Sequence, residues 1–269
     1  MTHEVETLTD LPYGNAAGYL LFLDLYRPEP MPAQPLPVIV YLHGGMWRRG
    51  DKALSSDPFL VQTGRYIVAS INYRRSDQAI FPAQLHDAKA AVRWLRANAQ
   101  KLGIDPTRIG VWGHDAGGHL ASLLGVTGHV ADLEGSNGSA DQSSSVQAVV
   151  AVAAPSDLSQ LGDWHDEPDS PESLLVGGAL PTRSELVQQA NPLNYLDQPA
   201  PPFLLIHGEH DQTVPISQSL ILQQALQAAN AEVELLRLAE AEHNFGTNSP
   251  YLQQINQQIL AFFDRVLQA

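Results

Sequence analysis

The sequence predicts an α/β protein, in which a mostly parallel β-sheet is covered by helices on both faces. Short apolar runs rich in β-branched residues alternate along the chain with longer segments of helical periodicity. Of the 269 residues, 44% are hydrophobic and 16% are charged, a composition that can build one large core. Because no internal repeat or long linker divides the chain, we expect a single domain over residues 1–269.

Short apolar runs bounded by turn residues are expected to form the strands. The run Val38–Leu42 ends at a Gly-Gly turn, and Arg108–Trp112 leads directly into Gly113. Val233–Leu238 alternates apolar with charged residues, as a strand near a sheet edge does. The other expected strands are Tyr19–Tyr26, Tyr66–Asn72, Val146–Val152 and Phe203–Ile206.

Helical periodicity marks the segments between these strands. Pro82–Gln100 places apolar residues on one face at spacings of three and four, namely Leu85, Ala88, Val92 and Leu95. The helix that follows Gly113 is expected to contain Leu120–Leu124. Two further helices are expected at Ile216–Ala229 and Leu252–Leu267.

Two segments lack a periodic pattern. Gly128–Ser145 is rich in glycine, serine and acidic residues, and Ser159–Arg183 contains Trp164 together with prolines and several acids. Both are predicted to be irregular, and the acids between 163 and 172 are interpreted as solvated surface. We expect residues 159–183 to form a small cap or loop insertion over the site.

Charge and composition exclude several classes of function. A formal net charge of −14 disfavours binding to nucleic acid or to anionic membranes. The absence of cysteine excludes disulfides, thiolate metal sites and a cysteine nucleophile. No apolar run approaches the length of a membrane span, and the polar start of the chain is unlike a signal peptide. A cytoplasmic location is therefore expected, with a mature secreted form as the alternative.

The strongest local motif is Gly113-His114-Asp115-Ala116-Gly117-Gly118, between an expected strand and an expected helix. This context is that of a nucleophile elbow, a tight turn whose flanking glycines let the central side chain project above the sheet. The helix N-terminus beneath it favours negative charge. The central residue here is Asp115, where such elbows commonly carry serine.

Two further motifs complete a possible catalytic set. His43-Gly44-Gly45-Met46-Trp47 follows a buried strand, and its backbone N–H groups are candidates for an oxyanion hole with the N–H of Ala116. Gly45 is the preferred donor, with Gly44 or Met46 assisting. Asp211 and His243 each follow a later strand, in the chain order nucleophile, acid, histidine.

In this set Asp211 would orient His243, which would act as general base. His207 and His210 flank Asp211, but a structural role is preferred for them, and neither a metal site nor a cofactor is expected. Trp47, Trp164 and Pro155 are candidates for the wall of the substrate pocket.

Motifs spread from about Tyr19 to Phe263 carry a resemblance to a known family. They are Leu23–Pro28 (LDLYRP), His43–Trp47 (HGGMW), Asn72–Arg74 (NYR), Phe81–Gln84 (FPAQ), Gly103–Pro106 (GIDP), Gly113–His119 and Asp211 with Val214-Pro215. In combination they resemble the feruloyl/acetylxylan-esterase-like branch of the α/β-hydrolases, and more widely the hormone-sensitive-lipase-like esterases and kynurenine formamidases.

The resemblance implies an α/β-hydrolase fold with a central sheet of about eight strands. It also implies a serine carboxylesterase that acts on short acyl or aryl esters without a cofactor. The expected partner is therefore a small-molecule ester, bound by a monomer or a homodimer.

Asp115 departs from the family, which has serine at this position. A carboxylate that attacked an ester carbonyl would form an anhydride, and an ionised Asp115 could place its own oxygen in the oxyanion hole. Three hypotheses follow: an engineered or otherwise impaired esterase, a hydrolase whose Asp115 attacks an alkyl carbon as in haloalkane dehalogenases and epoxide hydrolases, or a catalytically silent binding module.

Overall fold

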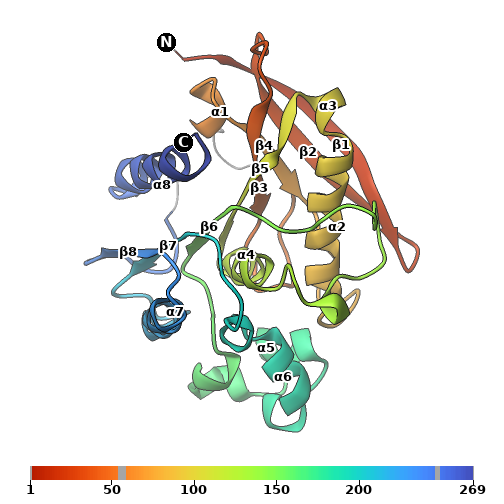
Figure 1. The fold of residues 1–269 in the computed structure, drawn as a ribbon. Coiled ribbons are helices and arrows are strands. Elements are labelled where there is room, and N and C mark those ends of the chain that lie inside the picture. The colour runs from red at the N-terminus through yellow and green to blue at the C-terminus, as the bar shows by residue number, and fades with distance from the viewer. Residues whose placement is uncertain (1, 54–58, 246–248, 269) are drawn as a thin grey trace.

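The computed structural model describes residues 2–53, 59–245 and 249–268. Its centre is an eight-stranded sheet in the order β1-β2-β4-β3-β5-β6-β7-β8 (Figure 1). The strands are β1 (Glu4–Ala16), β2 (Tyr19–Glu29), β3 (Leu36–Leu42), β4 (Ile67–Ile71), β5 (Ile104–His114), β6 (Ala148–Val152), β7 (Phe203–Gly208) and β8 (Val233–Leu238). From β4 to β8 the neighbours are parallel, whereas β1 and β2 join the sheet as antiparallel strands.

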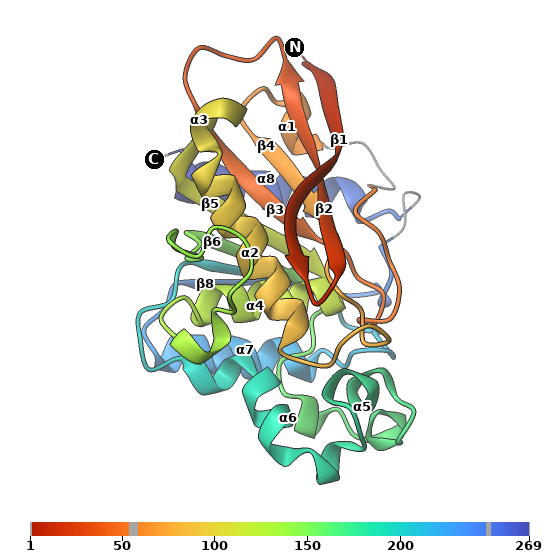
Figure 2. The same cartoon turned by 90° about the vertical axis from the view of Figure 1, so that its right-hand side faces the viewer.

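Helices cover both faces of this sheet. They are α1 (Phe59–Gln62), α2 (Ala83–Ala97), α3 (Ala99–Leu102), α4 (Ala116–Val126), α5 (Pro171–Val176), α6 (Ser184–Ala190), α7 (Ser217–Ala228) and α8 (Leu252–Leu267). Short 3-10 helices occur at Ala131–Leu133, Leu158–Gln160, Asp163–Asp166, Leu180–Thr182 and Pro192–Tyr195. The view turned by 90° shows α2 and α4 on one face, with α8 behind the sheet (Figure 2).

Alternation along the central strands divides the core into two layers. In β3, Val38 and Val40 pack with residues of α2 and α4, whereas Ile39 packs with residues of α1 and α8. This is the period of two that a strand imposes on its side chains. Because both faces are buried, the parallel strands read as continuous apolar runs, as the sequence analysis expected.

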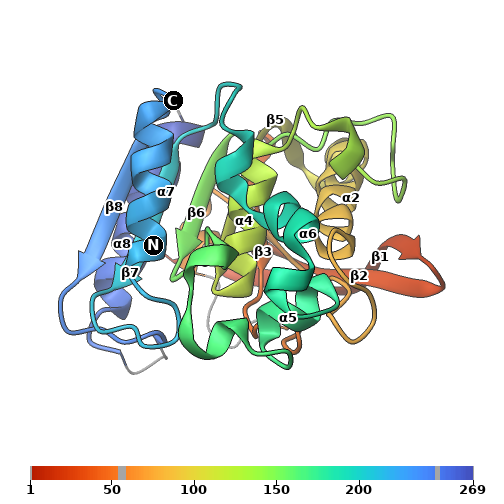
Figure 3. The same cartoon turned by 90° about the horizontal axis from the view of Figure 1, so that it is seen from below.

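The chain between β6 and β7, residues 153–202, is called here the β6–β7 segment. It contains α5 and α6, and both lie on the α4 side of the sheet, farther from the strands than α4 (Figures 1 and 3). Ser170 caps α5 by accepting the Ser173 N–H, with Pro171 at the first helical position. The expectation of irregular chain over Ser159–Arg183 is therefore wrong for α5 and the 3-10 turns.

Several other boundaries differ from the predicted ones. The N-terminal strand β1 was not predicted, because it lies at the sheet edge and most of its side chains are exposed or half-buried. The helix expected over Pro82–Gln100 ends at Ala97, where the Asn98 side chain donates to the Trp94 carbonyl. The strand expected at Arg108–Trp112 begins at Ile104, which pairs with Leu36 across an irregularity in the ladder.

Candidate active site

Asp115 occupies a strained turn between β5 and α4. Its backbone has φ 53° and ψ −122°, a conformation that L-residues rarely adopt and that marks functional turns. A Cβ at Gly117 would lie 2.0 Å from the Leu42 carbonyl oxygen, and one at Gly113 would lie 2.2 Å from the Gly117 backbone. The turn therefore requires glycine on both sides of Asp115, as the elbow motif predicted.

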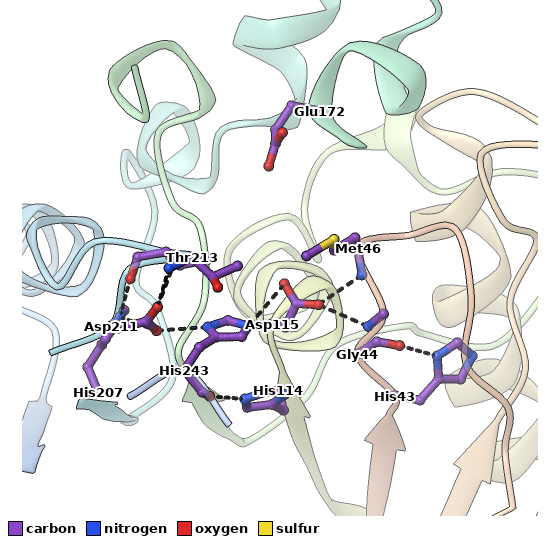
Figure 4. Close-up of polar contacts among 12 residues, drawn as sticks. His43, Gly44, Met46, His114, Asp115, Glu172, His207, Asp211, Thr213 and His243 are labelled. Atoms are coloured by element: carbon purple, nitrogen blue, oxygen red, sulfur yellow. Dashed lines mark hydrogen bonds and ion pairs between the residues drawn. The ribbon is translucent and has the colours of Figure 1, made fainter. Parts of the chain in front are cut away.

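The Asp115 carboxylate is bound by the turn that follows β3. Its Oδ2 accepts the N–H groups of Gly45 at 2.9 Å and of Met46 at 2.8 Å (Figure 4). Among the described residues, it accepts no hydrogen bond from the N–H of Gly44 or Ala116, which were the other candidate donors. One side-chain oxygen of Asp115 thus lies where two backbone donors converge.

Buried side chains hold this turn from behind. Tyr73 donates its hydroxyl to the His43 carbonyl at 2.8 Å and stacks on the His43 ring. Trp47 is 1% exposed, and its indole N–H donates to His119 Nδ1 at 3.2 Å. The Trp47 ring therefore lies in the core behind the turn, and its place in a substrate pocket stays a prediction.

His119 connects the turn to the β6–β7 segment. Its Nε2 donates to the Ala190 carbonyl at 2.7 Å, which leaves Nδ1 free to accept from Trp47. Complete burial lowers the pKa of His119 to about 4, so the ring stays neutral and keeps this tautomer.

His243 and Asp211 lie on the other side of Asp115. His243 Nδ1 is 2.7 Å from Asp211 Oδ2, and His243 Nε2 is 3.9 Å from Asp115 Oδ1 (Figure 4). The second distance is an ion-pair contact, too long for a hydrogen bond. The structure thus brings together Asp115, His243 and Asp211, three residues that the sequence analysis selected.

The environment favours an imidazolium beside two carboxylates. Burial alone would lower the pKa of His243, but the hydrogen bond and charge of Asp211, together with the charge of Asp115, raise it above its usual 6.5. Burial alone would raise the pKa of Asp211, but its hydrogen bonds with His207 and His243 hold it well below the usual range. Asp211 is therefore an anion at neutral pH.

A loop after β7 fixes the Asp211 carboxylate. Its Oδ1 accepts the N–H groups of Thr213 and Val214, both at 2.8 Å. His207 Nε2 lies 2.8 Å from the Val214 carbonyl and 3.3 Å from Asp211 Oδ2, and its Nδ1 lies 2.7 Å from the Ser219 hydroxyl. The structural role preferred for His207 agrees with these contacts.

The remaining candidate pocket residues lie in the β6–β7 segment. Pro155 is buried shortly after β6, and Trp164 is 43% exposed and stacks on His165. Their contact with substrate stays a prediction. One acid in the stretch 163–172, Glu172, is only 3% exposed, so the interpretation of this stretch as solvated surface is wrong at that position.

Within residues 2–53, 59–245 and 249–268, no group of three or more histidine and acidic side chains is arranged to hold a metal ion. Over the same residues, no helix is both long and apolar enough to span a bilayer.

Comparisons with known proteins agree with this fold. The BD-FAE family model matches residues 23–226. Esterase LipC of Mycobacterium tuberculosis is 32% identical over 249 residues, which cover 87% of this chain and 58% of LipC. The chain thus spans less than two thirds of the length of this curated relative.

Solved structures of esterases match over nearly the whole chain. A truncated form of a carbohydrate esterase from gut microbiota is 29% identical with a TM-score of 0.88, covering 100% of this chain and 98% of that one. An acetyl ester-xyloside bifunctional hydrolase from Caldicellulosiruptor lactoaceticus is 25% identical with a TM-score of 0.80, covering 96% of each chain. The chain therefore belongs to the BD-FAE family and has the α/β-hydrolase fold of a carboxylesterase-type hydrolase.

Proposed function

We propose that this chain is a carboxylic ester hydrolase scaffold whose nucleophile position is Asp115 and whose ester hydrolysis is impaired by that residue. The substrates of the scaffold would be short acyl or aryl esters, cleaved without a cofactor. The proposed roles are general base for His243, orienting acid for Asp211, and oxyanion donors for Gly45 and Met46. Residues 159–183 would serve as a cap on the substrate pocket.

One observation carries the proposal of impairment. Asp115 Oδ2 accepts the N–H groups of Gly45 and Met46, the two donors that would stabilise the oxyanion of a reacting ester. An ester carbonyl could use these donors only after displacing an anion held by two charge-assisted hydrogen bonds. The nucleophile position therefore competes with the substrate for the same donors.

The chemistry of a carboxylate adds to this competition. Attack of an Asp115 oxygen on an ester carbonyl would expel the alcohol and leave a mixed anhydride, which lies high in energy. A serine hydroxyl at this position would instead pass its proton to His243 and form an ordinary acyl ester. The scaffold supports the serine reaction better than the aspartate one.

A second candidate function is displacement at an alkyl carbon by Asp115. The observation that favours it is that the two carboxylate oxygens of Asp115 have different contacts. Oδ2 is held by backbone donors, and Oδ1 lies 3.9 Å from His243 Nε2 without a hydrogen bond to it. Oδ1 would displace a leaving group to form an alkyl ester, which water activated by His243 would then hydrolyse.

The first experiment measures hydrolysis of a short aryl acetate by the chain and by its Asp115→Ser variant. The serine variant should gain at least tenfold in kcat/KM, about 1.4 kcal/mol of barrier. Asp115→Asn is the matched control, because it removes the charge and retains the shape without supplying a nucleophile. Equal rates for all three proteins would contradict the proposal.

The second experiment separates the alkyl-carbon reaction from a silent binding module. The His243→Ala variant is incubated with a primary alkyl halide and a simple epoxide, and its intact mass is measured. A covalent adduct that is lost with Asp115→Asn would establish Asp115 as a nucleophile. No adduct, together with no gain from Asp115→Ser, would favour a binding module.

A further inference from the structure

His114 is the residue before Asp115, and its ring contacts the backbone that carries His243. It is the last residue of β5, and its Nε2 lies 2.9 Å from the His243 carbonyl oxygen (Figure 4). Because a carbonyl can only accept, Nε2 carries the hydrogen and donates it. Two consecutive residues of the elbow thus contact one histidine: Asp115 faces the His243 ring, and His114 binds its main chain.

The chain around His243 has few other anchors. Among the described residues, no other hydrogen bond reaches the backbone of residues 242–245. The loop is fixed just before them at Ala241, whose N–H and carbonyl both form backbone hydrogen bonds, and the His243 ring is held by Asp211. The bond from His114 therefore sets where the His243 backbone lies, whereas Asp211 sets how the ring is turned.

The His114 ring supplies this bond as a neutral donor. Burial and the positive charge of His243 lower the pKa of His114, although the charges of Asp115 and Asp211 and the bond to the carbonyl oppose this change. The centroids of the two imidazole rings are 5.1 Å apart. A cationic donor so close would lower the pKa of His243, so a neutral imidazole holds the general base without making it a weaker base.

Another edge of the His114 ring packs against the turn that follows β3. A Cβ at Gly44 would lie 3.2 Å from His114 Nδ1 and 3.3 Å from the Asp115 Cβ. The next two residues of this turn, Gly45 and Met46, donate to the Asp115 carboxylate. The His114 side chain thus contacts both the turn with the backbone donors and the loop with the histidine.

We propose that His114 is a positioning residue, which fixes the distance between the nucleophile position and the general base by holding the His243 carbonyl. The path that sets this distance is short. It runs from Asp115 to its neighbour His114, across one hydrogen bond to His243, and from the His243 ring back to Asp115. Catalytic rates depend steeply on such distances, since a misplacement of about 1 Å can cost about a hundredfold. This inference rests on the proposed function, because it concerns the same site.

The first test measures the electrostatic coupling between Asp115 and His243 and needs no enzymatic activity. The coupling is the fall in the pKa of His243, followed by NMR, when Asp115→Asn removes the neighbouring charge. If His114 holds His243 in place, this fall should shrink to about half or less in the His114→Leu background. Because each comparison is made within one background, the direct effect of the lost His114 ring on His243 cancels.

Two further variants make this result specific. His114→Gln is the rescue variant, because the glutamine amide nitrogen reaches about as far as Nε2 and carries hydrogens, so it should restore most of the coupling. Phe245→Leu is the matched control, because Phe245 lies on the same loop and touches the His114 ring but has no polar atom in its side chain. It should leave the coupling unchanged. An undiminished coupling in His114→Leu, or an equal reduction in Phe245→Leu, would overturn the inference.

A kinetic test separates positioning from substrate binding. In the Asp115→Ser background, His114→Leu should lower kcat for an aryl acetate about tenfold and change KM less than about twofold, and His114→Gln should restore most of kcat. A loss that appears only in KM, or that glutamine does not restore, would contradict a positioning role. If Asp115→Ser itself does not hydrolyse the ester, the proposed function fails, whereas the NMR coupling still decides the inference about His114.

Discussion

The base of the site and the β6–β7 segment above it are built by different means. At the base, backbone geometry sets the positions: Asp115 has φ 53°, and Gly117 is packed against the Leu42 carbonyl. The β6–β7 segment is joined to the base by side-chain hydrogen bonds, such as His119 to Ala190 and His165 to Thr213, and by apolar residues that share the core cluster. We therefore expect substitutions at the base to have large effects on activity and stability, and substitutions in the β6–β7 segment to have smaller, graded effects.

The largest expected effect lies at the base. In the Asp115→Ser background, His243→Ala should lower kcat/KM for an aryl acetate by about a thousandfold, about 4 kcal/mol, because the general base is lost. In the same background, Trp164→Ala in the segment should cost less than tenfold. Steady-state kinetics check both, and similar losses from the two variants would remove the distinction between the regions.

Glycine substitutions test the difference between the two regions through the free energy of unfolding. Gly117→Ala should cost about 3 kcal/mol of unfolding free energy, because the new Cβ would lie 2.0 Å from a backbone oxygen. Gly178→Ala in the β6–β7 segment should cost under about 1 kcal/mol, since its Cβ would meet the flexible Arg183 side chain. Urea unfolding measures both, and equal midpoints would show that the elbow tolerates the added methyl group.

His119 tests the connection between the two regions. His119→Leu should cost about 2 kcal/mol, because it leaves the Trp47 indole N–H and the Ala190 carbonyl buried without their partner. His129→Leu is the control, since His129 forms an exposed ion pair with Asp197 and should change stability very little. Thermal unfolding checks the pair, and a silent His119→Leu would show that the segment does not depend on this contact.

The smallest expected effect is a shift in titration. Asp115→Asn should lower the pKa of His243, because one of the two carboxylates that raise it loses its charge. A pKa raised in the folded state contributes stability that is full below the unfolded value of 6.5 and is lost as pH rises through the folded value. The stability that Asp115→Asn loses should therefore be greatest at acid pH.

NMR titration of the histidine ring signals measures this shift directly. The exposed His210, 3.7 Å from Glu240, serves as an internal reference that should not move with Asp115→Asn. An unchanged or higher pKa for His243 in the variant would mean that Asp115 does not act on it through charge.

The sequence predicted the base of the site well because local constraints leave signatures there. Close backbone contacts require glycine on both sides of Asp115 and in the Gly-Gly turn after β3. These glycines therefore appear in the sequence at a recognisable spacing. Burial on both faces made the parallel strands continuous apolar runs, and the prediction of about eight strands is confirmed. One Asp115 oxygen accepts the N–H groups of Gly45 and Met46, and the oxyanion hole itself stays a prediction.

Other parts could not be predicted, because distant residues determine them. The edge strand β1 has few buried side chains and forms only by pairing with β2. Glu172 is buried beside His165, and His165 in turn contacts Thr213, which lies 41 residues beyond Glu172 in the chain. Several acidic residues precede Glu172 in the sequence, so the local pattern indicated a solvated surface. The contacts of His165 with Glu172 and Thr213 join residues that are far apart in sequence, so no local pattern indicates them.

Thr213 takes part in two contacts that face opposite directions. Its carbonyl accepts from His165 of the β6–β7 segment, and its N–H donates to Asp211, the partner of His243. A displacement of the segment that pulls on His165 would therefore reach the Asp211 carboxylate through a single residue, Thr213. Opening of this segment for substrate entry and alignment of the imidazole for proton transfer would be mechanically coupled.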